Sequence, residues 1–267
     1  MQTSPTKRST RHNLFLATII LMGLGWFYTC VSVLNLPSVS SLQTTIPPTT
    51  SYIELARQET AITHQVVALR QISRYLQQAV VISEDSRFYE HHGVDWEAVK
   101  TAMHINWRRR RISHGASTLT MQLARNLYLS PHKTPLRKLR ETLIALEMEM
   151  FLSKERILEL YLNSVEWGNG IFGAEAAARH YFNLSASQLN MHQAAFLAAI
   201  LPNPRYYDEH RNTRLLQRRI RFIERRLGPP PPPMPLLPPI TIPALPPAEP
   251  PPLPESPPLP SDENEEW

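Results

Sequence analysis

Residues 79–93 read AVVISEDSRFYEHHG, an apolar helical run that ends in acids and then turns at a glycine. Glu84 closes the run, so we expect its carboxylate at the lip of a cleft, against apolar neighbours. Such surroundings raise the pKa of a carboxyl group and make it a better general base. An ordinary acid at a helix end is the plainer interpretation. Arg87, Phe88 and His91, at helical spacing after it, favour the cleft.

Helical patterns continue on both sides of this stretch, from about residue 61 to residue 227, with no convincing run of alternating strand residues. Asp95 is expected to cap a helix, and Thr134 followed by Pro135 predicts another helix start. Ser153 opens the next one, and Asn190 with Gln193 has capping-box spacing before a helix that Pro202 ends. The sequence therefore predicts an all-α, mainly helical domain over 61–227.

Three of these helices have a predictable apolar stripe. The expected stripes are Trp96, Val99, Met103 and Trp107; Leu139, Leu143, Leu146 and Met150; and Leu216, Ile220, Ile223 and Leu227, before a stop at Gly228. The second stripe is expected to be buried and the third to be the inner face of the last helix. Arg137, Lys138 and Glu141 would then share another face.

A second polar segment, residues 115–126, reads GASTLTMQLARN. Ser117, Thr118 and Thr120 are expected to begin a helix, whose hydroxyl and backbone N–H groups would attract a phosphate. Gln122 and Arg125 project near the same face one and two turns later. A capped amphipathic helix with a solvated arginine is the alternative interpretation.

A third segment, residues 137–141, places two cations and an acid on one helical face. Such a set suits a diphosphate, with a divalent cation bridging to the acid as a further option. A solvated face of salt-bridged charges is the alternative. A fourth segment, residues 154–163, reads KERILELYLN and is the last of the four polar segments.

The N-terminal end predicts a membrane anchor. Residues 14–36 carry no charge over 23 positions, enough to cross a ~30 Å hydrocarbon core as a helix. Lys7, Arg8 and Arg11 precede this run, so residues 1–12 are expected in the cytosol, 13–36 in the membrane and the rest outside. A cleaved signal peptide is the competing interpretation. Residues 37–60, rich in Ser, Thr and Pro, look like a linker.

The C-terminal end has a different composition, because eighteen of the 26 prolines follow Gly228. Residues 228–267 are therefore expected to be a disordered, proline-rich tail that ends in acids. Such a tail is either a passive spacer or a segment that docks into a partner's aromatic groove. The single cysteine, Cys30, excludes an internal disulfide framework.

Taken together, the four segments resemble the motifs of the peptidoglycan glycosyltransferases, glycosyltransferase family 51. Their order and lengths resemble the monofunctional biosynthetic peptidoglycan transglycosylases. The similarity covers about residues 80–227 and includes the stretches 168–178 and 201–204. It implies a lysozyme-like helical domain that polymerises lipid II, and thus a bacterial inner-membrane protein with a periplasmic catalytic domain.

The resemblance also implies roles for single residues. Glu84 would be the general base, and Glu141 the second essential glutamate, which supports the leaving diphosphate or a Mg²⁺ or Mn²⁺ ion. The positions where the family binds the donor's pyrophosphate and sugar are Ser117, Gln122, Arg125, Asn126, Arg137 and Lys138. Met121 and Arg125 depart from the family's pattern, which more often has glutamine and lysine there.

Partners follow from the same resemblance. Lipid II and the growing glycan would be the substrates, and Arg108–Arg111 would contact anionic headgroups of the inner membrane, because the family has a membrane-dipping region near this place. A solvated charge run is the alternative. The tail is the segment that could meet other cell-wall synthesis proteins, and an anchored external domain has no access to nucleic acid.

Three other functions would account for parts of this sequence. A lysozyme-type hydrolase also pairs two carboxylates in a helical domain, but it would not need the cationic cluster. A non-catalytic scaffold would depend on the anchor and the tail instead. A bifunctional penicillin-binding protein would need a transpeptidase domain, and the SxxK match at Ser130–Lys133 lies inside the helical region and is best read as coincidence.

Overall fold

The computed structural model describes residues 15, 17–25, 28, 36–111 and 115–228. Half of the predicted anchor at 13–36, and all of the predicted tail at 228–267 except its first residue, lie outside these residues. In the part of the chain that is described, no helix has both the length and the apolar character needed to cross a membrane.

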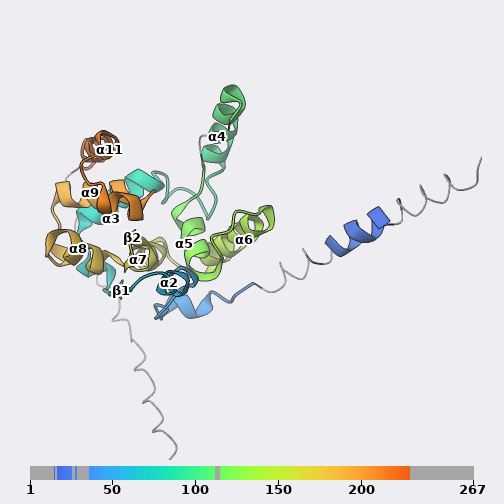
Figure 1. Ribbon diagram of the computed structural model, residues 1–267, viewed down its shortest axis with the longest axis horizontal. Helices are drawn as coiled ribbons and strands as arrows, with labels where there is room; N and C mark the ends of the chain where they lie inside the picture. Colours follow the sequence, from blue (N-terminus) through green and yellow to red (C-terminus); the bar gives the residue numbers. More distant parts are fainter. Residues whose placement is uncertain (1–14, 16, 26–27, 29–35, 112–114, 229–267) are drawn as a thin grey trace, which may run out of the picture.

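The described chain is mainly helical, as the sequence predicts (Figure 1). Its α-helices are α2 (Ser51–Arg57), α3 (Arg74–Glu84), α4 (Trp96–Arg109), α5 (Leu119–Tyr128), α6 (Pro135–Phe151), α7 (Lys154–Ser164), α8 (Ala174–Phe182), α9 (Met191–Ile200), α10 (Pro204–Glu209) and α11 (Arg214–Glu224). Short 3₁₀ turns are η1 (Ser40–Gln43), η2 (Leu69–Gln71) and η3 (Ala186–Gln188).

The predicted helix starts are confirmed by their caps. The side chains of Asp95, Thr134 and Ser153 accept hydrogen bonds from backbone N–H groups three residues on. Asn190 and Gln193 form the predicted capping box of α9, which ends at Ile200, before Pro202. These polar side chains satisfy N–H groups that the first helical turn leaves without partners, so they fix where each helix begins.

A small sheet was missed by the all-α prediction. It contains β1 (Thr63–His64), β2 (Glu166–Gly168) and β3 (Ile171–Phe172) in the order β1-β3-β2. β1 runs parallel to β3, and β2 is antiparallel to it. Strands of two or three residues are too short for alternation to be visible in the sequence.

Two groups of helices hold the core. α3 packs against α9 and α11, where Leu216, Ile220 and Ile223 are buried as predicted. α5 packs against α6 and α7. The C-terminal end of α3 therefore lies where the two groups meet, which is where the first polar segment begins.

The predicted stripe of α6 is wrong. The buried face of this helix carries Glu141, Ile144, Ala145 and Met148, whereas Leu139, Leu146 and Met150 are exposed. The sequence pattern favoured the leucines because they are apolar. The structure instead turns the acid inward, where cations neutralise it.

The apolar stripe of α4 is present but unburied. Trp96, Met103 and Trp107 are exposed, and the side chain of Trp107 is 86 % accessible. Ala102 is the buried residue of this helix. α4 projects away from the two helix groups (Figure 1), so its apolar residues have no protein surface to cover them among the described residues.

Residues 37–60 do not behave as the predicted linker. Val39 and Leu42 are buried in the main core, and Ile53 in α2 is fully buried beside Phe172. The Nε of Arg156 donates a hydrogen bond to the Leu42 carbonyl over 2.7 Å. This segment is part of the fold.

Candidate active site

Glu84 ends α3 as the sequence predicts, and its side chain is 13 % exposed. The Nε2 of Gln122 donates a hydrogen bond to one carboxylate oxygen over 3.1 Å, and Nη2 of Arg219 lies 3.9 Å from the other. Burial raises the pKa of Glu84, while the hydrogen bond from Gln122 and the charges of Arg219 and Arg125 oppose the rise. The net effect is a raised pKa, which suits a general base.

Gln122 is oriented by a second partner. The hydroxyl of Tyr161, on α7, donates to Oε1 of Gln122 over 3.1 Å. Burial raises the pKa of Tyr161 well above its ordinary value, so the phenol keeps its proton and remains a donor. With the amide oxygen occupied in this way, the amide NH₂ group points at Glu84. Tyr161 belongs to the fourth segment, but its apolar surroundings gave no sequence signal of this role.

Glu141 is also buried, but its partners are positively charged. Its side chain is 1 % exposed, and its two oxygens accept from Arg137 and from Lys138, the latter over 2.5 Å. Lys138 Nζ also donates to the hydroxyl of Ser117 over 2.7 Å. The acid therefore fixes two cations beside a hydroxyl group.

α5 connects the two acids. Ser117 immediately precedes the helix and touches Lys138, while Gln122 lies within it and touches Glu84. Arg125 follows on the same half-buried face and acts by charge on Glu84. The structure thus brings six predicted residues to the side of α5: Glu84, Gln122, Arg125, Ser117, Lys138 and Glu141. Buried Nε atoms of Arg125 and Arg137 have no hydrogen-bond partner among the described residues, so both guanidinium groups retain donor capacity.

The start of α5 differs from the prediction. Thr118 is the N-cap and donates to the Gly93 carbonyl, and the Thr120 hydroxyl donates to Glu149. The backbone N–H of Leu119 donates to Asp85 over 2.9 Å. The protein supplies its own anion at this helix terminus, so the terminus is not the phosphate site that the sequence suggested.

Asp85 is a structural acid, although it adjoins Glu84. Both of its oxygens lie 3.0 Å from Nε2 of buried His91. The loop between them makes turns instead of continuing the helical spacing expected for Arg87, Phe88 and His91. Gly93 ends the loop with a φ of 82°, and a Cβ there would lie 3.1 Å from the Ala145 carbonyl oxygen, so glycine is required.

Asn126 lies one turn after Gln122 on α5, and its side chain is buried. Its part in substrate binding stays a prediction.

Most polar residues of the fourth segment hold the fold together. Lys154 donates to the His91 carbonyl and to Glu149. Glu159 accepts from the backbone N–H of Leu69. Asn163 makes two hydrogen bonds to the backbone of Val67. This helix positions the loop after Glu84 at one end and the chain before α3 at the other.

The residues present do not fit a divalent metal ion held by the protein alone. Both oxygens of Glu141 are engaged by cations. Across residues 36–111 and 115–228, no group of three or more His, Cys, Asp or Glu gathers as metal ligands would. Mg²⁺ demands several oxygen ligands in octahedral geometry, and a single salt-bridged carboxylate does not supply them.

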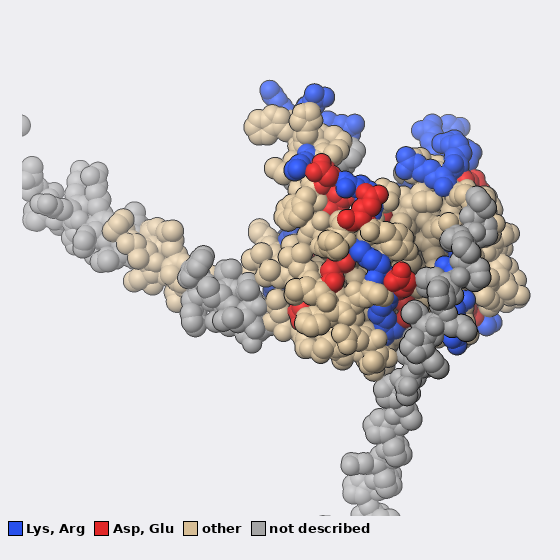
Figure 2. Space-filling view, turned by 180° about the vertical axis from the view of Figure 1, so that it is seen from behind, with Lys and Arg blue, Asp and Glu red and all other residues tan. Residues whose placement is uncertain are grey.

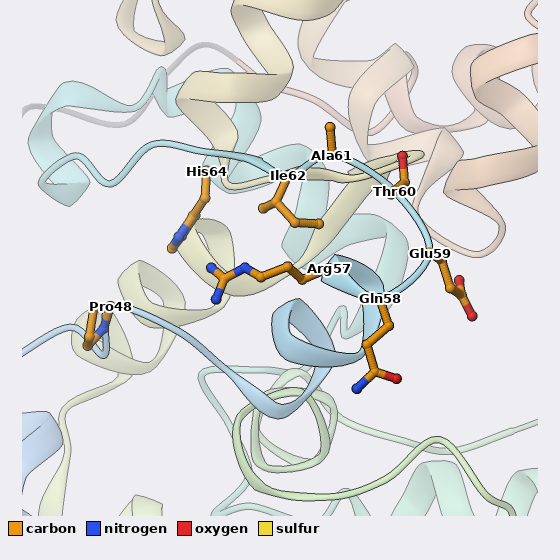
Figure 3. A pocket seen from close by; sticks show the side chains of 8 residues that line it. All are labelled: Pro48, Arg57, Gln58, Glu59, Thr60, Ala61, Ile62 and His64. Atoms are coloured by element: carbon orange, nitrogen blue, oxygen red, sulfur yellow. The ribbon is translucent and has the colours of Figure 1, made fainter.

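A hollow of about 750 Å³ is lined mainly by the segment between α2 and β1, and none of its lining residues is a predicted site residue (Figure 3). Its charged side chains already have partners, because Arg57 pairs with Glu54 and Glu59 with Arg205. We therefore do not assign chemistry to it. The lining residues are Pro48, Arg57, Gln58, Glu59, Thr60, Ala61, Ile62 and His64.

Comparison with known families gives a match to the family described as Transglycosylase over residues 48–227. The chain belongs to the transglycosylase family. Its relatives include a biosynthetic peptidoglycan transglycosylase of Methylobacillus flagellatus, 52 % identical over 63 % of this chain and 74 % of the relative. The same description applies to a Nitrosospira multiformis protein, 42 % identical over 80 % of this chain and 93 % of the relative. A Bordetella pertussis protein is 53 % identical over 63 % and 72 %.

The matched region contains all the site residues described above. It begins at residue 48, inside the segment that the sequence suggested was a linker. The membership is thus consistent with the packing of α2 into the domain.

Proposed function

We propose that this chain is a peptidoglycan glycosyltransferase in which Glu84 is the general base and the cations held by Glu141 receive the leaving diphosphate. The polymerisation of glycan strands in cell-wall biosynthesis follows from the family and from the relatives. The observation that carries the residue assignment is that α5 contacts Glu84 through Gln122, while Ser117, just before the N-cap of this helix, contacts Lys138.

The reaction joins two lipid-linked saccharides. Glu84 takes the proton from the 4-hydroxyl of the N-acetylglucosamine of an acceptor lipid II. The freed oxygen forms a bond to the anomeric carbon of the growing chain, from the side opposite the diphosphate. The bond from that carbon to the diphosphate oxygen breaks, and undecaprenyl diphosphate leaves with the electron pair.

The two acids have separate tasks in this scheme. The pKa of Glu84 is raised because the group is buried, so its carboxylate is a stronger proton acceptor than an exposed one. Arg137 and Lys138 neutralise the charge that develops on the leaving diphosphate, and Glu141 keeps both cations in place. Ser117, Gln122 and Arg125 complete the polar surface between them.

Contact with a bilayer is part of the proposal. The exposed apolar residues of α4 lead into Arg108–Arg111, and lysine and arginine side chains gather at the tip of this helix (Figure 2). Aromatic and apolar side chains next to arginines are typical of a surface that lies at the headgroup level of a membrane. Members of this family act at the cell envelope. The single-pass inner-membrane anchor with a periplasmic catalytic domain remains our prediction.

A polymerisation assay separates this function from that of a lysozyme-like hydrolase. The full-length protein should convert labelled lipid II into long polymer and leave finished, uncrosslinked glycan intact. Release of fragments from the glycan, with no polymer from lipid II, would contradict the proposal. Removal of residues 229–267 should leave polymerisation unchanged in vitro, whereas a scaffold acting through its tail would lose its role.

A further inference from the structure

Arg219 approaches Glu84 from a helix that the mechanism has not used. It lies on α11, beside Ile220, which is buried where this helix packs against α3. Its side chain is 33 % exposed, and its Nη2 lies 3.9 Å from Oε1 of Glu84. Gln122 holds the other oxygen, Oε2, from α5. The two oxygens of the base are therefore approached by different helices.

The other charged and titratable groups around Glu84 have fixed partners or act at longer range. Asp85 follows it in the chain and is bound to His91 and to the start of α5. The Tyr161 hydroxyl is bound to Gln122. Arg125 acts on Glu84 by charge from α5. From α9, the Ala198 carbonyl accepts a hydrogen bond from Ser83, the residue before Glu84.

Burial is the main effect that raises the pKa of Glu84, and the charge of Asp85 adds a smaller effect in the same direction. The charges of Arg219 and Arg125 act in the opposite direction and lower this pKa. Without Arg219, Oε1 of Glu84 would lose its nearby cation, while the negative charge of Asp85 would remain.

Arg219 also lines a hollow of about 270 Å³, together with Ser83, Arg218, Phe222 and Ile223. Figure 2 shows basic side chains gathered over α11, and those that this helix carries are arginines. Arg219 thus lies beside the base and also lines an open hollow at the surface.

We propose that Arg219 is a positioning residue for Glu84, which fixes the carboxylate from the α11 side and balances its charge while the acceptor enters. This inference rests on the proposed function, because it assumes that Glu84 is the base. It adds a fourth helix, α11, to a site that sequence motifs placed on α3, α5 and α6. Arg219 is one of several arginines in this helix, so the sequence alone did not indicate this role.

The test compares Arg219→Gln with Arg221→Gln in the full-length protein, using lipid II polymerisation across a range of pH. Arg221 is exposed and lies two residues further along the same helix. Its replacement by glutamine removes the same charge as the replacement of Arg219. Loss of Arg219 removes an interaction that lowers the pKa of Glu84, so that pKa rises. The base is then protonated at a higher pH, and the acid limb of kcat/KM should move to higher pH.

We expect kcat of Arg219→Gln to fall roughly tenfold near neutral pH, because a misplaced base is costly but is still present. KM should change little, and Arg221→Gln should match the wild type. Arg219→Lys should restore the wild-type acid limb with a partly recovered kcat. An unmoved acid limb, or a loss confined to KM, would overturn the proposal, since the latter would make Arg219 a substrate-binding group.

Two controls keep the result interpretable. If the glutamine variant does not fold, Arg219→Lys carries the test alone, and a wild-type kcat in that variant would contradict a positioning role that depends on guanidinium geometry. If the wild-type protein makes no polymer from lipid II, the proposed function fails. If it makes polymer and Arg219→Gln behaves like Arg221→Gln, only the role of Arg219 fails.

Discussion

Glu84 and Glu141 are both largely buried, yet their partners differ in charge. Glu84 receives one hydrogen bond from a neutral amide and has its nearest cation at 3.9 Å, whereas Glu141 is in direct contact with two cations. A buried carboxylate with weak compensation gains affinity for a proton. One that is doubly paired holds its neighbours in place instead. The comparison supports our proposal that one family motif supplies a base and another supplies an anchor for cations.

The largest expected effect is that of Glu84→Gln. We expect a loss of about 10²–10⁴ in the rate of polymerisation, the usual contribution of a general base, with lipid II still bound. Polymer formation and lipid II binding are measured on the same preparation. Glu90→Gln is the control, because Glu90 is an exposed acid of the same segment that pairs with Arg87. A Glu84→Gln variant with near-normal turnover would remove Glu84 from its role.

Glu141→Gln should come next, with a loss of roughly 10²-fold, the lower end for removal of a group that stabilises developing charge. The amide cannot neutralise Arg137 and Lys138, so both cations lose the group that holds them. Steady-state kinetics on lipid II give the loss. Glu147→Gln, on the same helix, controls for changes to α6. Activity within a few-fold of the wild type would contradict the anchoring role.

The pH profile of the wild-type protein sharpens the same contrast. Because burial raises the pKa of Glu84, the base becomes protonated at a higher pH than an exposed glutamate would. Activity should therefore fall, as the pH is lowered, before ordinary carboxylates titrate. The acid limb of kcat/KM reports this group in the free protein. A profile that stays flat down to the ordinary range of glutamate would argue against a buried base.

The smallest effect concerns α4 and not the acids. Replacement of Arg108–Arg111 by glutamine should lower activity on anionic vesicles at least about fivefold relative to detergent. A single cation near a charged bilayer contributes ~1 kcal/mol, and that alone corresponds to this factor. Polymerisation in both media, normalised to the wild type, is the measurement. Equal losses in vesicles and detergent would argue against headgroup contact.

The sequence predicted the helix caps, the inner stripe of α11 and the position of Glu84, because each depends on a local pattern. Gln122 and Arg125 share a face as their spacing predicts, for the same reason. The buried face of α6 was not predictable from hydrophobicity. There, an acid turns inward to meet two cations, and leucines remain outside.

Non-local partners account for the remaining misses. Asp85 binds His91 and the first N–H of α5, a helix that begins 34 residues later. The parallel pairing of Thr63 with Ile171 joins strands more than 100 residues apart. Arg219 meets Glu84 only after α11 has packed on α3. None of these contacts leaves a periodic trace in the chain.

The packing of residues 39–57 has a practical consequence for recombinant fragments. A truncation that starts at residue 61, where the helical pattern first becomes obvious, would delete Val39, Leu42 and Ile53 and expose the surfaces that they cover. Each such side chain contributes about 1.5–3 kcal/mol when fully buried. The guanidinium group of Arg156 would also lose the Leu42 carbonyl. A soluble fragment intended for crystallisation should therefore begin before Val39.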